Sequence, residues 1–150
     1  MSPFEKYPRI TPFLSFDSNA EEAVDFYLTV FANSRKLDEL RKPDGTILTI
    51  AFELDGQKFT ALNGGPSFKF TEAISLVVRC DTQNEVDDYW AKLTEGGSEV
   101  ECGWLKDKFG LSWQIVPAQL LEWIKKPKAM EAMMKMKKFD IAELERAALS

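Results

Sequence analysis

One order of predicted elements occurs twice in this chain, and this duplication constrains the fold more than any single motif. Ile10–Phe16 alternates between apolar and polar residues, and the stretch behind it places Val24, Tyr27 and Val30 at helical spacing. The predicted strands of the first half cover 10–16, 35–42, 46–54 and 57–63, and the predicted helix covers 20–32. After Gly65 the order begins again about 65 residues along the chain, a distance that suits one duplicated supersecondary unit rather than a solenoid.

The second half repeats the strand and the helix and then adds further strands. Ala73–Cys80 is rich in β-branched residues, and Val86, Trp90 and Leu93 follow it as an amphipathic stripe. Predicted strands near 99–105 and at 111–117 close this half. We therefore expect one domain, 1–150, with a first module at 9–66, a shorter second module at 73–117 and a helical tail at 118–150.

Three pairs of residues have the spacing that caps helix N-termini. They are Ser18 with Glu21, Thr82 with Glu85, and Asp140 with Glu143. The third pair predicts a short final helix, behind one that starts after Pro127. The methionines of the tail are Met130, Met133, Met134 and Met136. Because their side chains are apolar and adaptable, we expect them to be buried at a module boundary or a dimer contact.

The chain contains no histidine, which removes many catalytic and metal-binding arrangements. Neither a Ser-His or Cys-His nucleophilic pair nor a zinc site with imidazole ligands can form. The glycine-rich nucleotide loops, the G-x-S-x-G serine elbow and a C-x-x-C pair are also missing. The sequence therefore predicts no cofactor and leaves open whether the protein is an enzyme.

Composition and charge narrow the partners and the location. With 150 residues, of which 45% are hydrophobic, the chain can bury roughly 70% of its unfolded surface without disulfides. Its net charge of −5 disfavours nucleic acid and anionic membranes as partners. The N-terminus lacks the apolar core of a signal peptide, and the apolar runs are far shorter than the ~20 residues that span a bilayer. We therefore expect a cytoplasmic protein in which Cys80 and Cys102 are reduced.

Several segments together resemble one known family. They are FLSFDSNAEEAVDFYLTVFANSR, the PDG and ELDGQKF turns, LNGGPSFKFTEAISLVVRC and CGWLKDKFGLSWQIVP. These segments are similar to the PhnB-like family, also named the 3-demethylubiquinone-9 3-methyltransferase domain family. That family belongs to the vicinal oxygen chelate superfamily, with glyoxalase I, bleomycin-resistance proteins and extradiol dioxygenases. The resemblance covers about residues 9–117, and the tail segment MMKMKKFDIAELERA also resembles family members.

The resemblance implies an α+β fold of two βαβββ modules. Their eight strands would form a curved, mixed sheet with an open concave face, with helices on the convex side and C-terminal helices added, and members usually form homodimers. In metal-using relatives the last strand of the second module supplies a Glu in a pattern like D-x-x-G-x-x-x-E. Here this pattern reads Asp107, Gly110 and Gln114, so an amide stands at the position of the carboxylate.

Alternation along the strands selects the residues that we expect to face the concave side. Counting places Ser112, Gln114 and Val116 on one face of the last strand and Trp113 and Ile115 on the other. The same count groups Thr11, Phe13 and Ser15, then Phe59, Ala61 and Asn63, and then Ser75, Val77 and Arg79. The expected ligand-binding residues are therefore Gln114, Ser75, Arg79, Asn63, Phe13, Ser15 and Trp104, and no metal ligand is expected.

Each of these residues also has an ordinary structural interpretation. Gln114 is equally suited to bonding a neighbouring backbone group. Arg79 suits an anionic ligand group, yet it also suits an ion pair with Asp81. Trp104 and Trp113 are suited to stacking on a flat ligand, but tryptophans in strands more often lie in the core.

Two functions remain after these exclusions. The first is a small-molecule-binding protein of the glyoxalase/bleomycin-resistance type that works without a transition metal. The second is a metal-dependent lyase, isomerase or dioxygenase-like enzyme that uses carboxylates such as Glu53 or Glu101. Ser75 and Gln114 are poor replacements for imidazole and carboxylate ligands, which favours the first function. Methyl transfer is disfavoured because SFDSNAEEA lacks the glycine-rich loop of typical S-adenosylmethionine enzymes.

Overall fold

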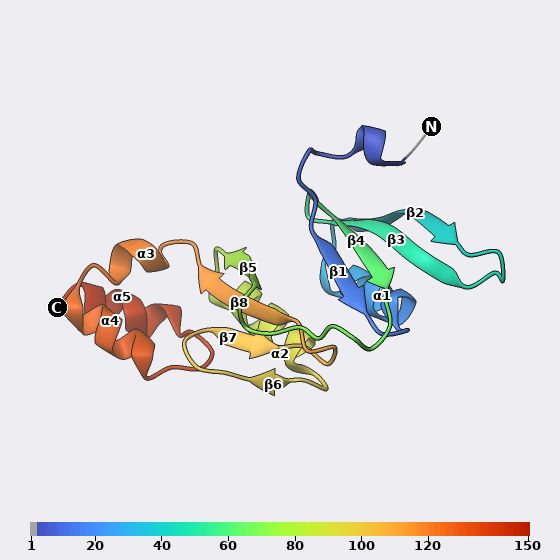
Figure 1. The fold of residues 1–150 in the computed structure, drawn as a ribbon. Helices are drawn as coiled ribbons and strands as arrows, with labels where there is room; N and C mark the ends of the chain where they lie inside the picture. The colour runs from blue at the N-terminus through green and yellow to red at the C-terminus, as the bar shows by residue number, and fades with distance from the viewer. Residues whose placement is uncertain (1–2) are drawn as a thin grey trace. The chain divides into compact units, whose positions relative to one another are not determined.

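The computed structural model describes residues 3–150, with side chains from Glu5 onward. The chain divides into two compact units, a first that ends at Lys69 and a second that covers Phe70–Ser150. In Figure 1 the first unit runs from blue to green and the second from green to red. Each unit contains one complete strand, helix and three-strand order, so the predicted duplication is present.

The first unit is a four-stranded sheet with one helix. Its elements are η1 (Pro3–Lys6), β1 (Phe13–Phe16), α1 (Ala20–Val30), β2 (Ser34–Arg41), β3 (Ile47–Leu54) and β4 (Gln57–Asn63). The strand order is β1-β4-β3-β2, in which β1 runs parallel to β4 and the other pairs are antiparallel. The crossover through α1 is what allows β1 and β4 to pair in parallel.

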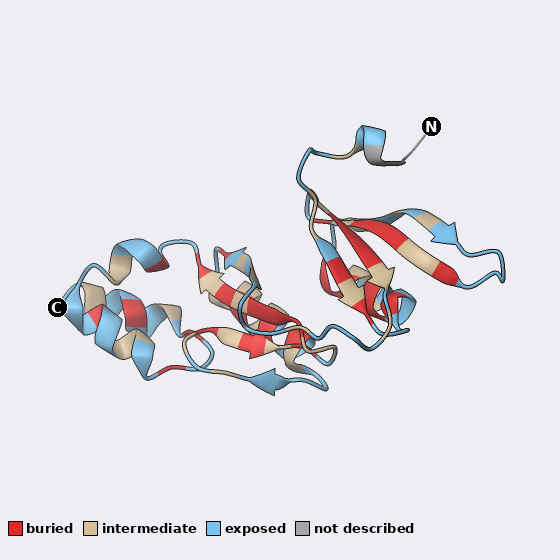
Figure 2. Ribbon diagram, in the orientation of Figure 1, coloured by how far each residue is buried: buried red, intermediate tan, exposed pale blue. Residues whose placement is uncertain are grey.

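The core of the first unit lies between α1 and one face of this sheet. Ala23, Val24 and Tyr27 of the helix are buried without measurable exposure. The Tyr27 ring stacks on Phe52 with centroids 6.4 Å apart, and Phe52 stacks on Phe59 at 5.3 Å. In Figure 2 the buried residues of β3 and β4 appear as red bands on these strands. Burying each large side chain of this kind contributes about 1.5–3 kcal/mol, so this face fixes the orientation of the sheet.

The second unit contains a similar sheet followed by three helices. Its elements are β5 (Ser75–Cys80), α2 (Gln83–Thr94), β6 (Ser98–Glu99), β7 (Trp104–Lys106), β8 (Ser112–Pro117), α3 (Leu120–Trp123), α4 (Pro127–Met134) and α5 (Ile141–Ala148). The strand order is β5-β8-β7-β6, with β5 parallel to β8. The predicted single strand near 99–105 is wrong: a turn with positive φ at Cys102 and Gly103 separates β6 from β7.

The C-terminal helices pack into a second apolar cluster. Leu120, Met136, Phe139 and Leu144 form its buried part, with Met133 partly buried beside them. The exposed side chains Met130 and Met134 lie outside this cluster. Burial of the tail methionines at a dimer contact therefore stays a prediction for two of the four.

The predicted α+β class with two βαβββ modules is confirmed. The eight strands are hydrogen-bonded as two four-stranded mixed sheets, one in each unit. Within residues 3–150, no helix has the length and apolar character needed to cross a bilayer.

Candidate functional site

One face of the second sheet carries most of the predicted ligand-binding residues. The register pairs Ser75 with Ser112, Val77 with Gln114 and Arg79 with Val116, and it pairs Gln114 with Trp104. We call this set, together with Lys106, the second open face. Trp113 and Ile115 point the other way and are buried, on the side where α2 contacts β8. Gln114 lies on the face opposite Trp113 and Ile115, and Val77 beside it is 60% exposed.

Gln114 and Ser75 are joined by a hydrogen bond on this face. Gln114 Nε2 donates to Ser75 Oγ at 2.9 Å, across the parallel pair β5 and β8. Gln114 Oε1 accepts no hydrogen bond from the residues that the structure describes. The pair therefore keeps one amide acceptor and one hydroxyl donor for a further partner.

The tryptophans differ in how their indole N–H groups are used. Trp113 Nε1 donates to Asp107 Oδ2 at 2.8 Å, and Trp90 Nε1 donates to Glu99 Oε1 at 2.7 Å. Trp104 is half-buried on the second open face, and no described residue accepts from its indole nitrogen. Buried indoles normally have a partner, so Trp113 is a core residue, whereas Trp104 is available for stacking and hydrogen bonding.

Asp107 fixes the turn that leads into β8. It is only 3% exposed, and its carboxylate accepts from Phe109 N at 2.8 Å and from Leu111 N at 3.1 Å, in addition to Trp113. Gly110, with φ of +88°, completes this turn. Asp107 and Gly110 of the D-x-x-G pattern are therefore structural residues, and they position the strand that carries Gln114.

The charged side chains at the edges of the second open face are already paired. Lys106 forms an ion pair with Glu72, whose pKa is lowered chiefly by the hydrogen bond from Lys106. Arg79 lies 3.8 Å from Asp81, at the limit of an ion pair, and both side chains are exposed. Arg79 thus makes the contact that its alternative interpretation predicted, and such exposed pairs are weak enough to be exchanged for a ligand.

In the first unit, the register separates Asn63 from the other predicted residues. The pairs Phe13 with Thr60 and Ser15 with Leu62 place these four side chains on the face away from α1. Asn63 pairs with Phe16 and shares the helix-covered face, as do Phe59 and Ala61. The predicted grouping of Asn63 with Phe13 and Ser15 is therefore wrong, because alternation along one strand does not fix its phase relative to another strand.

Asn63 instead fixes the start of α1. Its Oδ1 accepts from the backbone N–H of Ala20 at 2.9 Å, and its Nδ2 donates to the carbonyl of Ile47 at 3.1 Å. Asn19 is the N-cap and makes no side-chain cap bond, so the predicted capping box of Ser18 with Glu21 is wrong. The N-terminal backbone of α1 is thus bonded by a side chain at the end of β4, 43 residues away in the sequence, which no local spacing could indicate.

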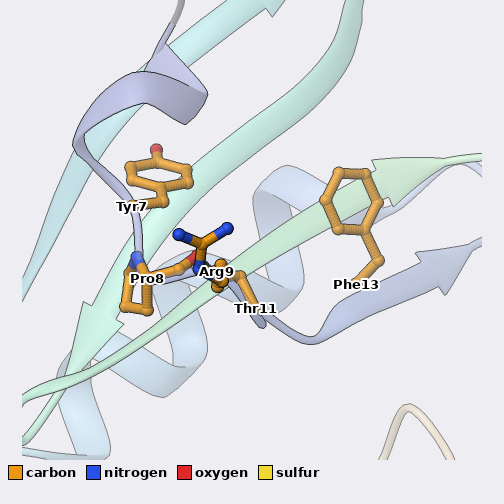
Figure 3. Close-up of a pocket in the computed structure, with 5 residues that line it drawn as sticks. All are labelled: Tyr7, Pro8, Arg9, Thr11 and Phe13. Carbon is orange, nitrogen blue, oxygen red and sulfur yellow. Dashed lines mark hydrogen bonds between the residues drawn. The ribbon is translucent and has the colours of Figure 1, made fainter.

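A pocket of about 490 Å³ lies in the first unit, beside Phe13 (Figure 3). It is lined by Tyr7, Pro8, Arg9, Thr11 and Phe13. We call it the Arg9 pocket. Phe13 is among the residues predicted from the sequence, but Tyr7 and Arg9 are not, since these two residues precede the first strand and match no motif. A second hollow of about 570 Å³ is polar and includes Asn63, Arg41 and Asp44 in its lining.

The buried hydroxyl groups of Ser15, Thr60 and Ser112 lack a hydrogen-bond partner among the described residues. Ser15 Oγ lies against Gly64, where an added Cβ would come within 2.6 Å of it. Ser15 and Thr60 lie on the face of the first sheet away from α1, and Ser112 lies on the face of the second sheet opposite Trp113 and Ile115. A buried hydroxyl without a partner costs about 1–3 kcal/mol, so these positions are unusual.

At the positions where the family resemblance implies metal ligands, the side chains of Ser75 and Gln114 do not fit a transition metal. A hydroxyl and an amide bonded to each other offer no anionic or imidazole ligand. Glu53 pairs with Arg35 at 3.2 Å, and Glu101 is exposed in the turn between β6 and β7. Among residues 3–150, no three His, Cys, Asp or Glu side chains come together as potential ligands.

Comparisons with known proteins agree with this fold. Residues 8–116 match the family model described as 3-demethylubiquinone-9 3-methyltransferase. The PhnB protein of Bacillus cereus is 35% identical, with a TM-score of 0.69 over 74% of this chain and 100% of that chain. Protein PA1353 of Pseudomonas aeruginosa is 20% identical, with a TM-score of 0.63 over 74% and 98% of the two chains. No curated protein matches the chain.

More distant neighbours share the fold alone. The fosfomycin resistance protein FosX of Listeria monocytogenes, complexed with Mn(II) and sulfate, is 13% identical, with a TM-score of 0.52 over 72% of this chain and 89% of that chain. The fold is that of the glyoxalase/bleomycin-resistance proteins. Within it, the chain belongs to the 3-demethylubiquinone-9 3-methyltransferase family, the PhnB-like family. The family model ends before α3, so the C-terminal helices lie beyond the matched part.

Proposed function

We propose that this protein binds a small, planar, partly aromatic molecule on the second open face, without a transition metal. The observation that supports this proposal is the hydrogen bond between Gln114 and Ser75, at positions where metal-using relatives carry metal ligands. Binding at such a face depends on shape and on neutral hydrogen bonds rather than on coordination. The proposal includes a cytoplasmic homodimer, which the resemblance to the family favours.

The groups on the second open face define what a ligand needs. Gln114 Oε1 can accept a hydrogen bond from a ligand, and the Ser75 hydroxyl can donate one to it. Trp104, in register with Gln114, offers its ring for stacking, and Val77 adds exposed apolar surface. A primary aromatic amide such as benzamide matches this arrangement, because its amide can pair with Gln114 and Ser75 while its ring lies on Trp104. Each hydrogen bond would contribute about 0.5–1.5 kcal/mol.

The residues present support neither metal-dependent catalysis nor methyl transfer. FosX was solved with Mn(II), but Ser75 and Gln114 supply no comparable ligand here. Methyl transfer is not part of the proposal, because the segment SFDSNAEEA between β1 and α1 has no glycine-rich loop. A metal-dependent lyase, isomerase or dioxygenase-like enzyme remains the outcome that metal analysis would reveal.

Three measurements on the full-length protein test the proposal. Elemental analysis after dialysis should find no stoichiometric divalent metal, and Mn(II) should leave the melting temperature unchanged. Benzamide should shift backbone NMR signals near Gln114 and Trp104, with chelator present or absent. Gln114→Ala and Trp104→Ala should each weaken that binding about five- to tenfold.

Met134→Ala, which changes an exposed residue of α4, is the matched control and should bind benzamide like the wild type. A tightly held divalent metal would favour the enzyme and overturn the proposal. So would benzamide binding that survives both substitutions on the second open face. Sedimentation of the same samples tests the homodimer, and a monomer at all concentrations would contradict the proposed homodimer.

A further inference from the structure

We propose that the Arg9 pocket of the first unit is a separate binding site for a small aromatic carboxylate. This site lies entirely within residues 7–13 and shares no residue with the second open face. The proposal therefore goes beyond the proposed function, and the two can be tested separately. Its volume of about 490 Å³ is within the range of small-ligand pockets.

The first observation is an arginine without a partner. Arg9 is exposed, and none of the described residues forms an ion pair or hydrogen bond with its guanidinium group. In Figure 3 this group lies between the rings of Tyr7 and Phe13. A planar guanidinium presents parallel N–H donors that match the two oxygens of a carboxylate. Among the described residues, no carboxylate is paired with this guanidinium, so it is available to an anionic ligand.

The second observation is the pair of aromatic walls. Tyr7 and Phe13 both line the pocket, and Phe13 is 49% exposed although it belongs to a strand. Thr60, which pairs with Phe13 in the sheet, is buried beside it. Rings on either side of a cation suit a flat aromatic body that carries its charge at one end. An aliphatic acid would use the arginine but not the walls.

The surrounding charges favour a single negative charge. Lys58 Nζ lies 5.6 Å from the centre of the Tyr7 ring. Burial, and then the nearby Asp38 carboxylate, raise the pKa of the Tyr7 phenol, so the phenol is a neutral hydrogen-bonding group. Among the described residues that line the pocket, Arg9 alone is charged, and it gives the lining one positive charge. A monoanionic carboxylate balances this charge, whereas a phosphate dianion would exceed it.

Local contacts hold the segment that carries Arg9. Thr11 Oγ1 donates to the carbonyl of Pro8 at 3.2 Å, and the backbone N–H of Thr60 donates to the carbonyl of Pro12 at 3.0 Å. Lys58 Nζ donates to the carbonyl of Lys6 at 3.4 Å. The two prolines also restrict the backbone on both sides of Arg9. The pocket is thus largely formed before a ligand arrives, which lowers the entropy cost of binding.

Titration of the labelled full-length protein with benzoate, followed by NMR, tests this site. Benzoate should shift the backbone signals of Arg9, Thr11 and Phe13. Arg9→Gln should raise the dissociation constant for benzoate at least about tenfold, because it removes a charge-assisted bidentate contact. Arg9→Lys should have a smaller effect, since lysine keeps the positive charge but lacks the two parallel N–H donors of the guanidinium group.

Matched ligands and a matched variant separate this site from the second open face. Benzamide, the neutral counterpart of benzoate, and cyclohexanecarboxylate, which lacks the aromatic ring, should both bind more weakly here. Arg146→Gln changes an exposed arginine of α5 that belongs to neither site and should leave benzoate binding unchanged. Benzoate that fails to bind, or binds equally to Arg9→Gln, overturns the proposal, and so does inorganic phosphate that binds as tightly as benzoate. None of these outcomes affects the benzamide test of Gln114 and Trp104.

Discussion

The hydroxyl of Thr60 is buried in the first sheet without a partner among the described residues, and this has a consequence for stability. Replacing it with a methyl group of similar shape removes an unsatisfied polar group. We expect Thr60→Val to raise the free energy of unfolding by about 1 kcal/mol, measured by urea denaturation. The β-branched shape is kept, so the strand should not be disturbed.

Thr46 provides the matched control with the opposite sign. Its hydroxyl donates to Asp44 Oδ1 at 2.6 Å in the turn before β3. Thr46→Val removes this partner, so it should lower stability while Thr60→Val raises it. If Thr60→Val instead destabilised the protein, an ordered water would be the first explanation, and the hydroxyl would not be unsatisfied.

Individual residues were predictable where one strand alone decided their orientation. Gln114 lies between large apolar residues that alternate with it, so its face followed from counting within β8. Asn63 failed because its face depends on how β4 pairs with β1, which the sequence of either strand does not contain. Arg9 and Tyr7 were missed for another reason, since the Arg9 pocket is formed by an irregular segment before β1.

At the scale of elements, the C-terminal segment is attached to the second sheet at a defined place. The backbone N–H groups of Cys102 and Gly103 donate to the carbonyls of Met136 and Lys137, each at 2.8 Å. The Phe139 ring packs against Gly103, where no Cβ would fit. Because β7 begins directly after Gly103, this contact also positions Trp104.

Phe139→Ala should therefore destabilise the protein strongly. Phe139 is 1% exposed within the cluster of Leu120, Met136 and Leu144, and such truncations cost about 3–5 kcal/mol. Chemical denaturation measures this loss. Leu149→Ala, at the exposed end of the chain, is the control and should change stability by less than about 0.5 kcal/mol. Equal effects of the two substitutions would show that the helices are not docked as described.

Elements were predicted best where their signals were local. The Thr82 cap of α2 and the Asp140 cap of α5 are present, with hydrogen bonds from Glu85 N at 3.2 Å and from Glu143 N at 3.1 Å. The β6 and β7 strands were merged in the prediction because Cys102, a non-glycine residue with φ of +58°, gives no turn signal. The short helix α3 (Leu120–Trp123) was also not predicted, since four residues are too few for a periodic pattern.

At the scale of the whole molecule, the absence of histidine predicts how stability depends on pH. No histidine titrates between about pH 6 and pH 8, so the melting temperature should be nearly constant there. On the acid side, Lys106 lowers the pKa of Glu72, and Lys138 and then Gln83 lower the pKa of Asp87. These folded-state pKa values lie below the unfolded ones, so their stabilising effect is present at neutral pH and is lost as the pH falls below about 4.5.

Above about pH 9, the buried thiol of Cys80 determines whether stability rises or falls with pH. Burial, the largest cause, raises the pKa of its thiol from 9.0 to about 12. The unfolded thiol ionises first, so stability should fall as the pH rises from about 9 towards 12. Differential scanning calorimetry from pH 3 to about pH 11 measures the loss of stability in acid and the loss in alkali. A transition centred near pH 6.5 would contradict this account.

The hydrogen bond between Ser75 and Gln114 joins two groups that neither gain nor lose a proton in the physiological range. A metal centre built from imidazole and carboxylate ligands weakens in mild acid as those ligands become protonated. Recognition through a serine and a glutamine has no such dependence. If the second open face binds its ligand as proposed, the protein would hold it equally well in an acidified cell and in a neutral one.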